Sequence, residues 1–183
     1  MKIKIFIILL TVLILLAGNF STVKTEKIDK NAVEICEIFF SNPEIFENGN
    51  YVNVNLKETN SFIRQPGNPV LPFYSKTMIF PLGTKIKSID FIHSQVETIR
   101  VTKKIQLAPR PLPINIEKVS MDNEIYQSTA LYPNVWYDYK TSGGLDRIGN
   151  HVTFLSINFY PVRYIPALDT LQYVDNIEIT INY

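Results

Sequence analysis

The chain has 183 residues, of which 46% are hydrophobic, enough for a sizeable core, so a disordered chain is excluded. Its 18 basic and 17 acidic side chains nearly balance, and no basic stripe marks it for nucleic acid or for an anionic membrane surface. Cys36 is the single cysteine, so no intramolecular disulfide can form and the fold depends on its core.

The N-terminus has the layout of a secretory signal peptide. Lys2 and Lys4 form a positive start, and an apolar run of 13 residues follows from Ile5 to Ala17. Because spanning a bilayer takes about 20 apolar residues, this run predicts a cleaved peptide and not an uncleaved anchor. We expect residues 1–21 to be the signal peptide and residues 22–31 a linker, leaving a secreted domain with no stable membrane insertion after cleavage.

The first part of the mature chain alternates apolar runs with turn residues. Residues 32–40 and 51–56 predict strands, and the second run alternates apolar side chains with asparagine, the period of a half-buried strand. Residues 42–50 hold proline, glycine and asparagine and predict a turn. Residues 64–72, with three prolines and one glycine, fit no regular element.

The middle of the chain predicts three strands and a proline-rich connection. Residues 74–80 predict a strand that ends in a turn at Pro81–Gly83. Residues 85–93 and 95–107 predict two adjacent strands, which suggests a hairpin. Residues 108–113 read APRPLP and exclude helix and central strand, because three of the six residues have no amide hydrogen.

The last part of the chain again predicts strands. Residues 114–129 are polar with room for one helical turn, and residues 141–150, with three glycines, predict a flexible loop. Residues 152–160 predict a strand that a proline interrupts before residues 162–165 resume it. Residues 176–183 alternate isoleucine with polar residues and predict a half-buried strand.

These segments indicate an all-β fold. We count eight or nine strands and no amphipathic helix of ten residues, and parallel sheets would need such crossover helices. Residues 32–183 are therefore expected to form one antiparallel β-sandwich, or a jelly-roll-like variant of it. Gly67, Gly83, Gly143 and Gly149 are expected to take positive φ in turns.

Two groups of motifs resemble those of a known family. Gly67-Asn68-Pro69-Val70-Leu71-Pro72, followed after a strand by Pro81-Leu82-Gly83, resembles the opening of gingipain-type propeptides, the N-terminal prodomains of family C25 cysteine peptidases. Leu131-Tyr132-Pro133, and later Tyr160-Pro161-Val162-Arg163-Tyr164 with Pro166, is similar to a second signature of that family. The resemblance covers about residues 33–183.

This resemblance implies a partner and a role. The partner is the C25 catalytic domain, in cis or in trans, which the propeptide helps to fold and keeps latent until the propeptide is removed. The catalytic domain itself is absent from these residues, so we expect either part of a longer or split precursor or a free-standing inhibitor.

The residues themselves predict no catalysis by this chain. Cys36 and either His93 or His151 are the residue types of a thiol–imidazole pair, but Cys36 lies in an apolar strand, where a lone cysteine usually acts as a small hydrophobe. Two histidines without clustered carboxylates make no zinc site, and no phosphate-binding loop or serine elbow is present. We expect no catalytic residue, no metal and no cofactor.

A propeptide that blocks a peptidase cleft must present an extended segment with one side chain in the specificity pocket. For an Arg- or Lys-specific enzyme that side chain is basic, because a carboxylate in the pocket pairs with it. Arg110 lies between prolines that favour an extended segment, and Arg147 lies in the glycine-containing loop. Lys103 and Lys104 are further candidates, and the mid-domain position of the family's inhibitory residue favours these lysines or Arg110. The alternative for each is a solvated surface charge.

An aromatic cluster supports a second hypothesis. Tyr132, Trp136, Tyr137 and Tyr139 lie close together in the sequence, and such rings can stack on sugars. The chain would then be a secreted β-sandwich module that binds carbohydrate or a cell-envelope partner. The alternative for the cluster is packing around Pro133.

Overall fold

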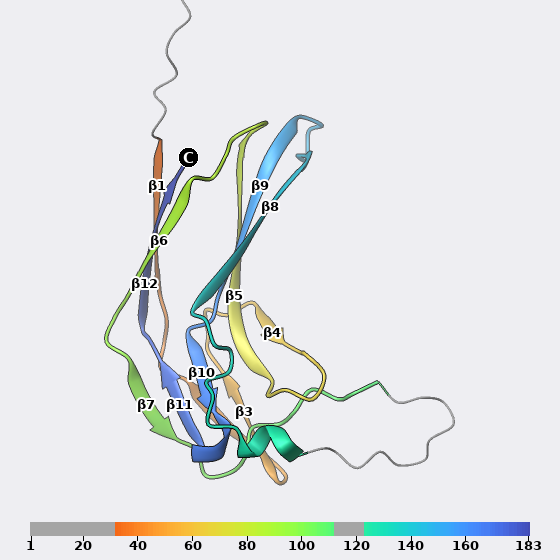
Figure 1. Ribbon diagram of the computed structural model, residues 1–183, viewed down its shortest axis with the longest axis vertical. Coiled ribbons are helices and arrows are strands. Elements are labelled where there is room, and N and C mark those ends of the chain that lie inside the picture. Colours follow the sequence, from red (N-terminus) through yellow and green to blue (C-terminus); the bar gives the residue numbers. More distant parts are fainter. Residues whose placement is uncertain (1–31, 112–122) are drawn as a thin grey trace, which may run out of the picture. The chain divides into compact units, whose positions relative to one another are not determined.

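The computed structural model describes residues 32–111 and 123–183, and the predicted signal peptide at 1–21 and linker at 22–31 lie outside these ranges. Within them the chain forms twelve strands and two short 3-10 helices, so the all-β prediction is confirmed (Figure 1). No helix in the described ranges is long and apolar enough to cross a membrane.

The described residues form the following strands and helices. The strands are β1 (Val33–Phe39), β2 (Glu44–Asn48), β3 (Tyr51–Asn55), β4 (Ser61–Ile63), β5 (Leu71–Pro81), β6 (Ser88–His93), β7 (Glu97–Arg100), β8 (Tyr137–Leu145), β9 (His151–Phe159), β10 (Val162–Ile165), β11 (Thr170–Tyr173) and β12 (Asn176–Asn182). The helices are η1 (Asn123–Gln127) and η2 (Pro166–Leu168). The helix η1 lies where the sequence allowed one helical turn.

All paired strands are antiparallel, as expected for a chain without crossover helices. One layer contains the sheet β1-β12-β6, and the facing layer contains the sheet β4-β5-β9-β8 (Figure 1). The sheet β10-β11-β7 and the hairpin β2-β3 complete the domain. The sandwich architecture predicted from the sequence is confirmed.

The core lies between the two layers and follows the alternation of the sequence. In β12, Ile177, Ile179 and Ile181 are fully buried, as predicted. From the facing layer, Leu155 and Ile157 of β9 are equally buried. Burial of several large aliphatic side chains, at about 1.5–3 kcal/mol each, is the main term that holds the layers together.

The predicted hairpin between residues 85–93 and 95–107 is wrong. The strand β6 pairs with β12 and β7 pairs with β11, so β6 and β7 continue along the β11–β12 segment and do not fold back (Figure 1). Ser94 holds the junction, because its hydroxyl accepts the amides of Asp175 and Asn176 and its own amide donates to the carbonyl of Asn176. The regular pairing in this region ends at Arg100, well before the predicted residue 107.

The predicted glycine loop at 141–150 is also mostly wrong. Residues 141–145 belong to β8, and only residues 146–150 form the turn to β9. The Phe154 ring packs over Gly144, where a Cβ atom would lie 2.9 Å from the ring, so packing requires this glycine. Positive φ occurs at Gly67, Gly83 and Gly149 as predicted, whereas Gly143 does not adopt it.

Two predictions for the first half of the chain are wrong in part. Residues 42–50 are not one turn, because β2 pairs with β3 and only Gly49 and Asn50 turn the chain; Gly49 has φ +59°. Residues 64–72 are irregular only as far as residue 70, since β5 begins at Leu71. Pro72 is tolerated there because it lies at the start of β5, where prolines are compatible with a strand and where β5 pairs with the short strand β4.

The turn after β5 provides a direct test of the fold. Gly83 has φ +84°, and its amide donates to the Thr153 hydroxyl across 3.2 Å. The substitution Gly83→Val forces a β-branched residue into the left-handed region, so we expect the free energy of unfolding to fall by about 1–3 kcal/mol. Arg147→Ala, at an exposed position, is the control and should change it by less than about 0.5 kcal/mol in the same urea titration. Equal unfolding midpoints for the two variants would contradict the turn geometry.

Candidate functional site

The chain that leads to Arg110 is fixed on one side by β3. We call residues 104–108 the stem. The Val52 amide donates to the carbonyl of Lys104 across 2.9 Å, and the Gln106 amide donates back to the carbonyl of Val52 across 3.2 Å. The stem residue Ile105 is fully buried. These contacts hold the stem as an extended segment beside the hairpin β2-β3.

On its other side the stem is bound by the turn that precedes β5. The Val70 amide donates to the Gln106 carbonyl, and the Ala108 amide donates to the Asn68 carbonyl, each across 2.9 Å. The Gly67 amide in turn donates to the carbonyl of Ala108 across 2.9 Å. The motif that begins at Gly67 therefore has a physical role, because its backbone receives the stem.

Gly67 also makes room for Arg110. It has φ +79°, and a Cβ atom on it would lie 2.6 Å from Nε and 2.9 Å from Nη2 of Arg110. The guanidinium therefore lies against the turn, and a side chain at position 67 would displace it. Arg110 is exposed, and Pro109 and Pro111 restrict the backbone on either side of it.

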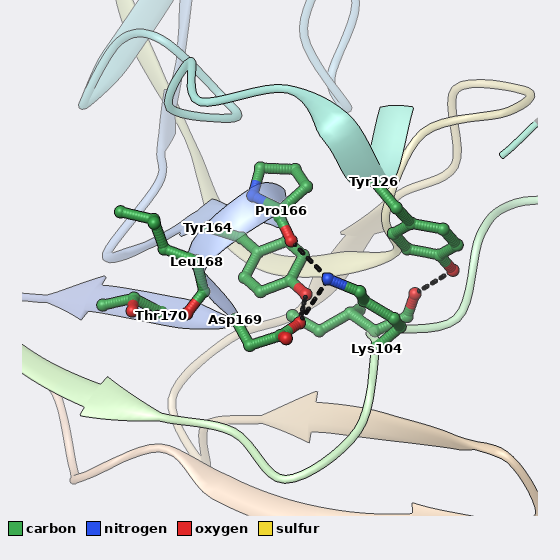
Figure 2. A network of polar contacts seen from close by, with 8 residues as sticks. Lys104, Tyr126, Tyr164, Pro166, Leu168, Asp169 and Thr170 are labelled. Atoms are coloured by element: carbon green, nitrogen blue, oxygen red, sulfur yellow. Dashed lines mark hydrogen bonds and ion pairs between the residues drawn. The ribbon is translucent and has the colours of Figure 1, made fainter. Parts of the chain in front are cut away.

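A network centred on Lys104 anchors the start of the stem (Figure 2). The Lys104 ammonium lies 2.8 Å from Oδ1 of Asp169 and donates to the carbonyl of Pro166 across 2.7 Å. The Tyr164 hydroxyl donates to the same Asp169 oxygen across 2.9 Å. Burial and this hydrogen bond raise the pKa of Tyr164 above its ordinary value. Two motif residues of the second half, Tyr164 and Pro166, thus serve to hold Lys104.

The same network also holds η1, the helix at residues 123–127. The Tyr126 hydroxyl donates to the carbonyl of Ile105 across 2.7 Å, and the Lys104 ammonium lies 5.6 Å from the centre of the Tyr126 ring (Figure 2). Burial raises the pKa of Tyr126 to about 12. The Ala167 amide donates to the carbonyl of Ser128. The chain before Pro111 and the chain after Asn123 are therefore tied to one place.

Sequence reasoning missed the carboxylate and one hydroxyl of this network. Asp169 has φ +51°, a conformation that aspartate tolerates better than most residues and that turns η2 into β11. The signal in the sequence was an aspartate three residues after Pro166, between the runs at 162–165 and 170–173. Tyr126 lies in a polar stretch where no pattern marked it.

The other two basic candidates lie in separate turns. The Lys103 ammonium is 2.7 Å from Oε2 of Glu47 and donates to the carbonyl of Gly49, so it braces the β2-β3 hairpin. Arg147 is exposed in the β8–β9 turn, away from the stem (Figure 1). The Asp146 carboxylate organises that turn by accepting several hydrogen bonds, of which the backbone amide of Asn150 does most to lower the pKa of Asp146.

The aromatic cluster is used in internal contacts. The Arg163 guanidinium lies 3.5 Å from the centre of the Trp136 ring, and burial lowers the pKa of Arg163. The His93 ring is 5.0 Å from the same indole, and Tyr137 stacks on Phe91 at 4.8 Å. Trp136 and Tyr137 are thus used in contacts within the domain, whereas the Tyr139 side chain is exposed, so the four rings do not form one open stacking surface for a sugar.

The residues considered for catalysis are also in structural contacts. Cys36 is buried, and the Lys76 ammonium from the facing layer donates to its sulfur across 2.8 Å. This hydrogen bond raises the pKa of Lys76. Residues 32–111 and 123–183 contain no cluster of three His, Cys, Asp or Glu residues that would hold a metal ion.

The fold defines a class of protein, the antiparallel β-sandwich. Residues 38–183 match the family model Propeptide_C25, so the chain belongs to this family. It is a propeptide domain and does not include the catalytic domain of a C25 peptidase. The family inferred from the Pro-Gly and Tyr-Pro motifs is confirmed.

Solved structures agree with the family assignment at the level of the fold. The gingipain K structure from Porphyromonas gingivalis, titled for its zymogenic latency, has a TM-score of 0.65 and 15% identity over 81% of this chain and 85% of that one. A complex of the Porphyromonas gingivalis RgpB pro- and mature domains has a TM-score of 0.55 and 16% identity over 81% of this chain and 77% of that one. A comparison with curated proteins gives no match.

The two neighbouring lysines allow a matched test of the network. We expect Lys104→Met to lower the free energy of unfolding by about 1–3 kcal/mol, because it leaves a partly buried carboxylate and carbonyl without their partner. Lys103→Met breaks a more exposed ion pair and should lower it by less than about 1 kcal/mol. Urea unfolding of both variants gives the comparison. Equal losses would show that the Lys104 network does not anchor the stem.

Proposed function

We propose that this chain is the propeptide of a secreted C25 cysteine peptidase, which it helps to fold and keeps latent. The observation that carries the proposal is the family match over residues 38–183. The two similar structures support it, because one is titled as a complex of pro- and mature domains and the other as a study of zymogenic latency. Secretion is supported by the positively charged start and apolar run of residues 1–17.

The stem favours Arg110 as the side chain that enters the peptidase cleft. It is exposed at the end of a segment whose backbone is held on both sides. Lys104 contacts Asp169, Lys103 contacts Glu47, and the Arg110 guanidinium lies against the Gly67 turn, so each of these side chains would leave contacts within the domain to enter a cleft. Arg147 is the second candidate, because its turn is exposed and displays it to solvent.

The proposed latency requires no chemistry from the propeptide. An extended segment would fill the cleft, and the Arg110 guanidinium would pair in two parallel hydrogen bonds with a carboxylate in the specificity pocket. Anchoring of the stem lowers the conformational entropy lost on binding. Pro111 follows Arg110, so the bond that a basic-specific peptidase would attack is a tertiary amide with no amide hydrogen. We infer that this slows cleavage of the inhibitor at that point.

The test is inhibition of the C25 catalytic domain encoded by the same organism. The purified secreted chain should inhibit it in a slow and tight manner at or below micromolar concentration. We expect Arg110→Ala to raise the inhibition constant by about 100-fold or more, the scale of a truncated hot-spot charge in a buried pocket. Arg147→Ala and Lys103→Ala are the matched controls and should change it by less than about threefold.

The possible outcomes distinguish the proposed inhibitory function from the choice of Arg110 as the inhibitory residue. Absence of inhibition by the unaltered chain, or an organism with no C25 catalytic domain, would contradict the proposed function. Inhibition that is lost in Arg147→Ala and kept in Arg110→Ala would leave the function standing and move the inhibitory residue to the β8–β9 turn. Circular dichroism of each variant shows that the fold is unchanged.

A further inference from the structure

The strand β8 forms an open edge of its sheet. In the described part of the chain it pairs only with β9, in nine successive residue pairs from Tyr137 to Leu145. Hydrogen bonds just beyond both ends of β8 follow the same register. The Tyr160 amide donates to the carbonyl of Trp136, and the Asp146 amide donates to the carbonyl of Asn150. Even-numbered residues of β8 therefore bond to β9.

The odd-numbered residues of β8 present their backbone to the outside. In an antiparallel ladder, bonding alternates between the two sides of a strand. Tyr139, Thr141 and Gly143 therefore point their amides and carbonyls away from β9. Of the usual protections this edge has only the charges of Asp138 and Lys140, because residues 137–145 contain no proline and no bulge, and residues 141–145 carry no charge.

Gly143 is not explained by the fold alone. It does not have positive φ, and the closest atom to an added Cβ would be the Val152 carbonyl oxygen at 4.0 Å. Glycine inside a strand is unfavourable, and it marks a bulge, a bend or a place where another backbone approaches closely. The unbroken register to β9 excludes a bulge and leaves a bend or the close approach of a second backbone.

A groove lies beside this edge, on the side where the two layers of the sandwich open. It has a volume of about 530 Å³ and is lined by Tyr139, Thr141 and Gly143 of β8 and by residues 84–86. A strand added to β8 would place every second side chain in this groove. Lys85 is exposed on the groove wall and makes no ion pair with any residue of the described ranges.

The charge of the groove discriminates between possible occupants. A carboxylate on the added strand would satisfy Lys85. A second copy of β8 would bring only uncharged residues to this face, namely Tyr139, Thr141, Gly143 and Leu145. The groove therefore favours an acidic strand from a different protein over self-pairing.

We propose that β8 is a docking strand to which an extended segment of the C25 catalytic domain pairs, with an Asp or Glu of that segment meeting Lys85. The proposal rests on the proposed function for its partner. It places the contact on an edge of the sandwich distinct from the stem that carries Arg110. Pairing of this kind uses main-chain hydrogen bonds for affinity and the groove for specificity.

Hydrogen exchange tests the pairing directly. In the free chain the amides of Tyr139, Thr141 and Gly143 should exchange quickly, because they have no partner in the sheet. On binding of the C25 catalytic domain from the same organism, these three amides should become protected by at least about tenfold. The amides of Asp138, Lys140 and Ser142 should be protected already in the free chain and serve as the internal reference.

Three substitutions separate docking from stability. Gly143→Val places a side chain where the added strand would approach β8, so binding should weaken by about tenfold or more. Valine is a good strand former, so the free energy of unfolding should stay the same or rise. Thr141→Pro removes an amide that the sheet does not use, and should weaken binding similarly; Thr141→Val keeps the amide and the shape and is its control. Lys85→Glu should weaken binding by about tenfold through repulsion.

Each outcome decides the proposal. Protection of the odd-numbered amides together with weaker binding by Gly143→Val supports it. A complex that forms without this protection, or that Gly143→Val leaves unchanged, overturns docking at β8 and leaves the proposed function intact. No complex at all overturns the proposed function and the docking with it. If the chain self-associates in analytical ultracentrifugation and the same amides become protected, the proposal is overturned, because β8 then pairs with β8 of a second copy of this chain.

Discussion

The contact between the Lys104 ammonium and the Asp169 carboxylate connects parts of the chain that are distant in sequence. It ties the stem to the turn between β10 and β11, while Tyr126 ties η1 to the carbonyl next to Lys104. The ammonium is satisfied by a carboxylate and a carbonyl, which a half-buried charge requires. Without this contact, the segment that carries Arg110 would depend on backbone bonds to β3 and the Gly67 turn, on the Tyr126 hydroxyl and on the burial of Ile105.

This arrangement explains why a rigid sandwich suits an inhibitory propeptide. The core between β9 and β12 supplies stability from aliphatic burial, and no residue of the domain needs to perform chemistry. In the proposed complex, the segment that follows the stem would deliver a basic side chain from a fixed base, and the β8 edge would offer a second contact some distance along the sandwich. Two contacts on one rigid body hold a partner in a single orientation, since each restricts the freedom left by the other.

Much of the fold could be predicted from the sequence because it depends on neighbouring residues. The rest could not be predicted, because it depends on contacts between residues that are distant in sequence. The alternation of isoleucine gave the core face of β12, and positive φ was correctly expected at Gly83, because both depend on neighbouring residues only. The continuation of β6 into β7 depends on hydrogen bonds from Ser94 to Asn176, which no local pattern reveals. The glycines of β8 were misread for the same reason, since Phe154 decides the role of Gly144. The basic candidates were found by residue type, but the contact of Lys104 with Asp169 could not be, because the two residues are distant in sequence.

In the proposed latent complex, the segment that follows the stem places Arg110 in the cleft of a C25 catalytic domain. A photo-reactive benzophenone side chain at position 110, irradiated in the complex with that domain and mapped by mass spectrometry, measures this directly. The account predicts cross-links from position 110 to residues around the catalytic cysteine and histidine, and none to the cleft from the same probe at position 147. Cross-links to the cleft from position 147 alone, or from neither position in a complex that inhibits, would contradict it.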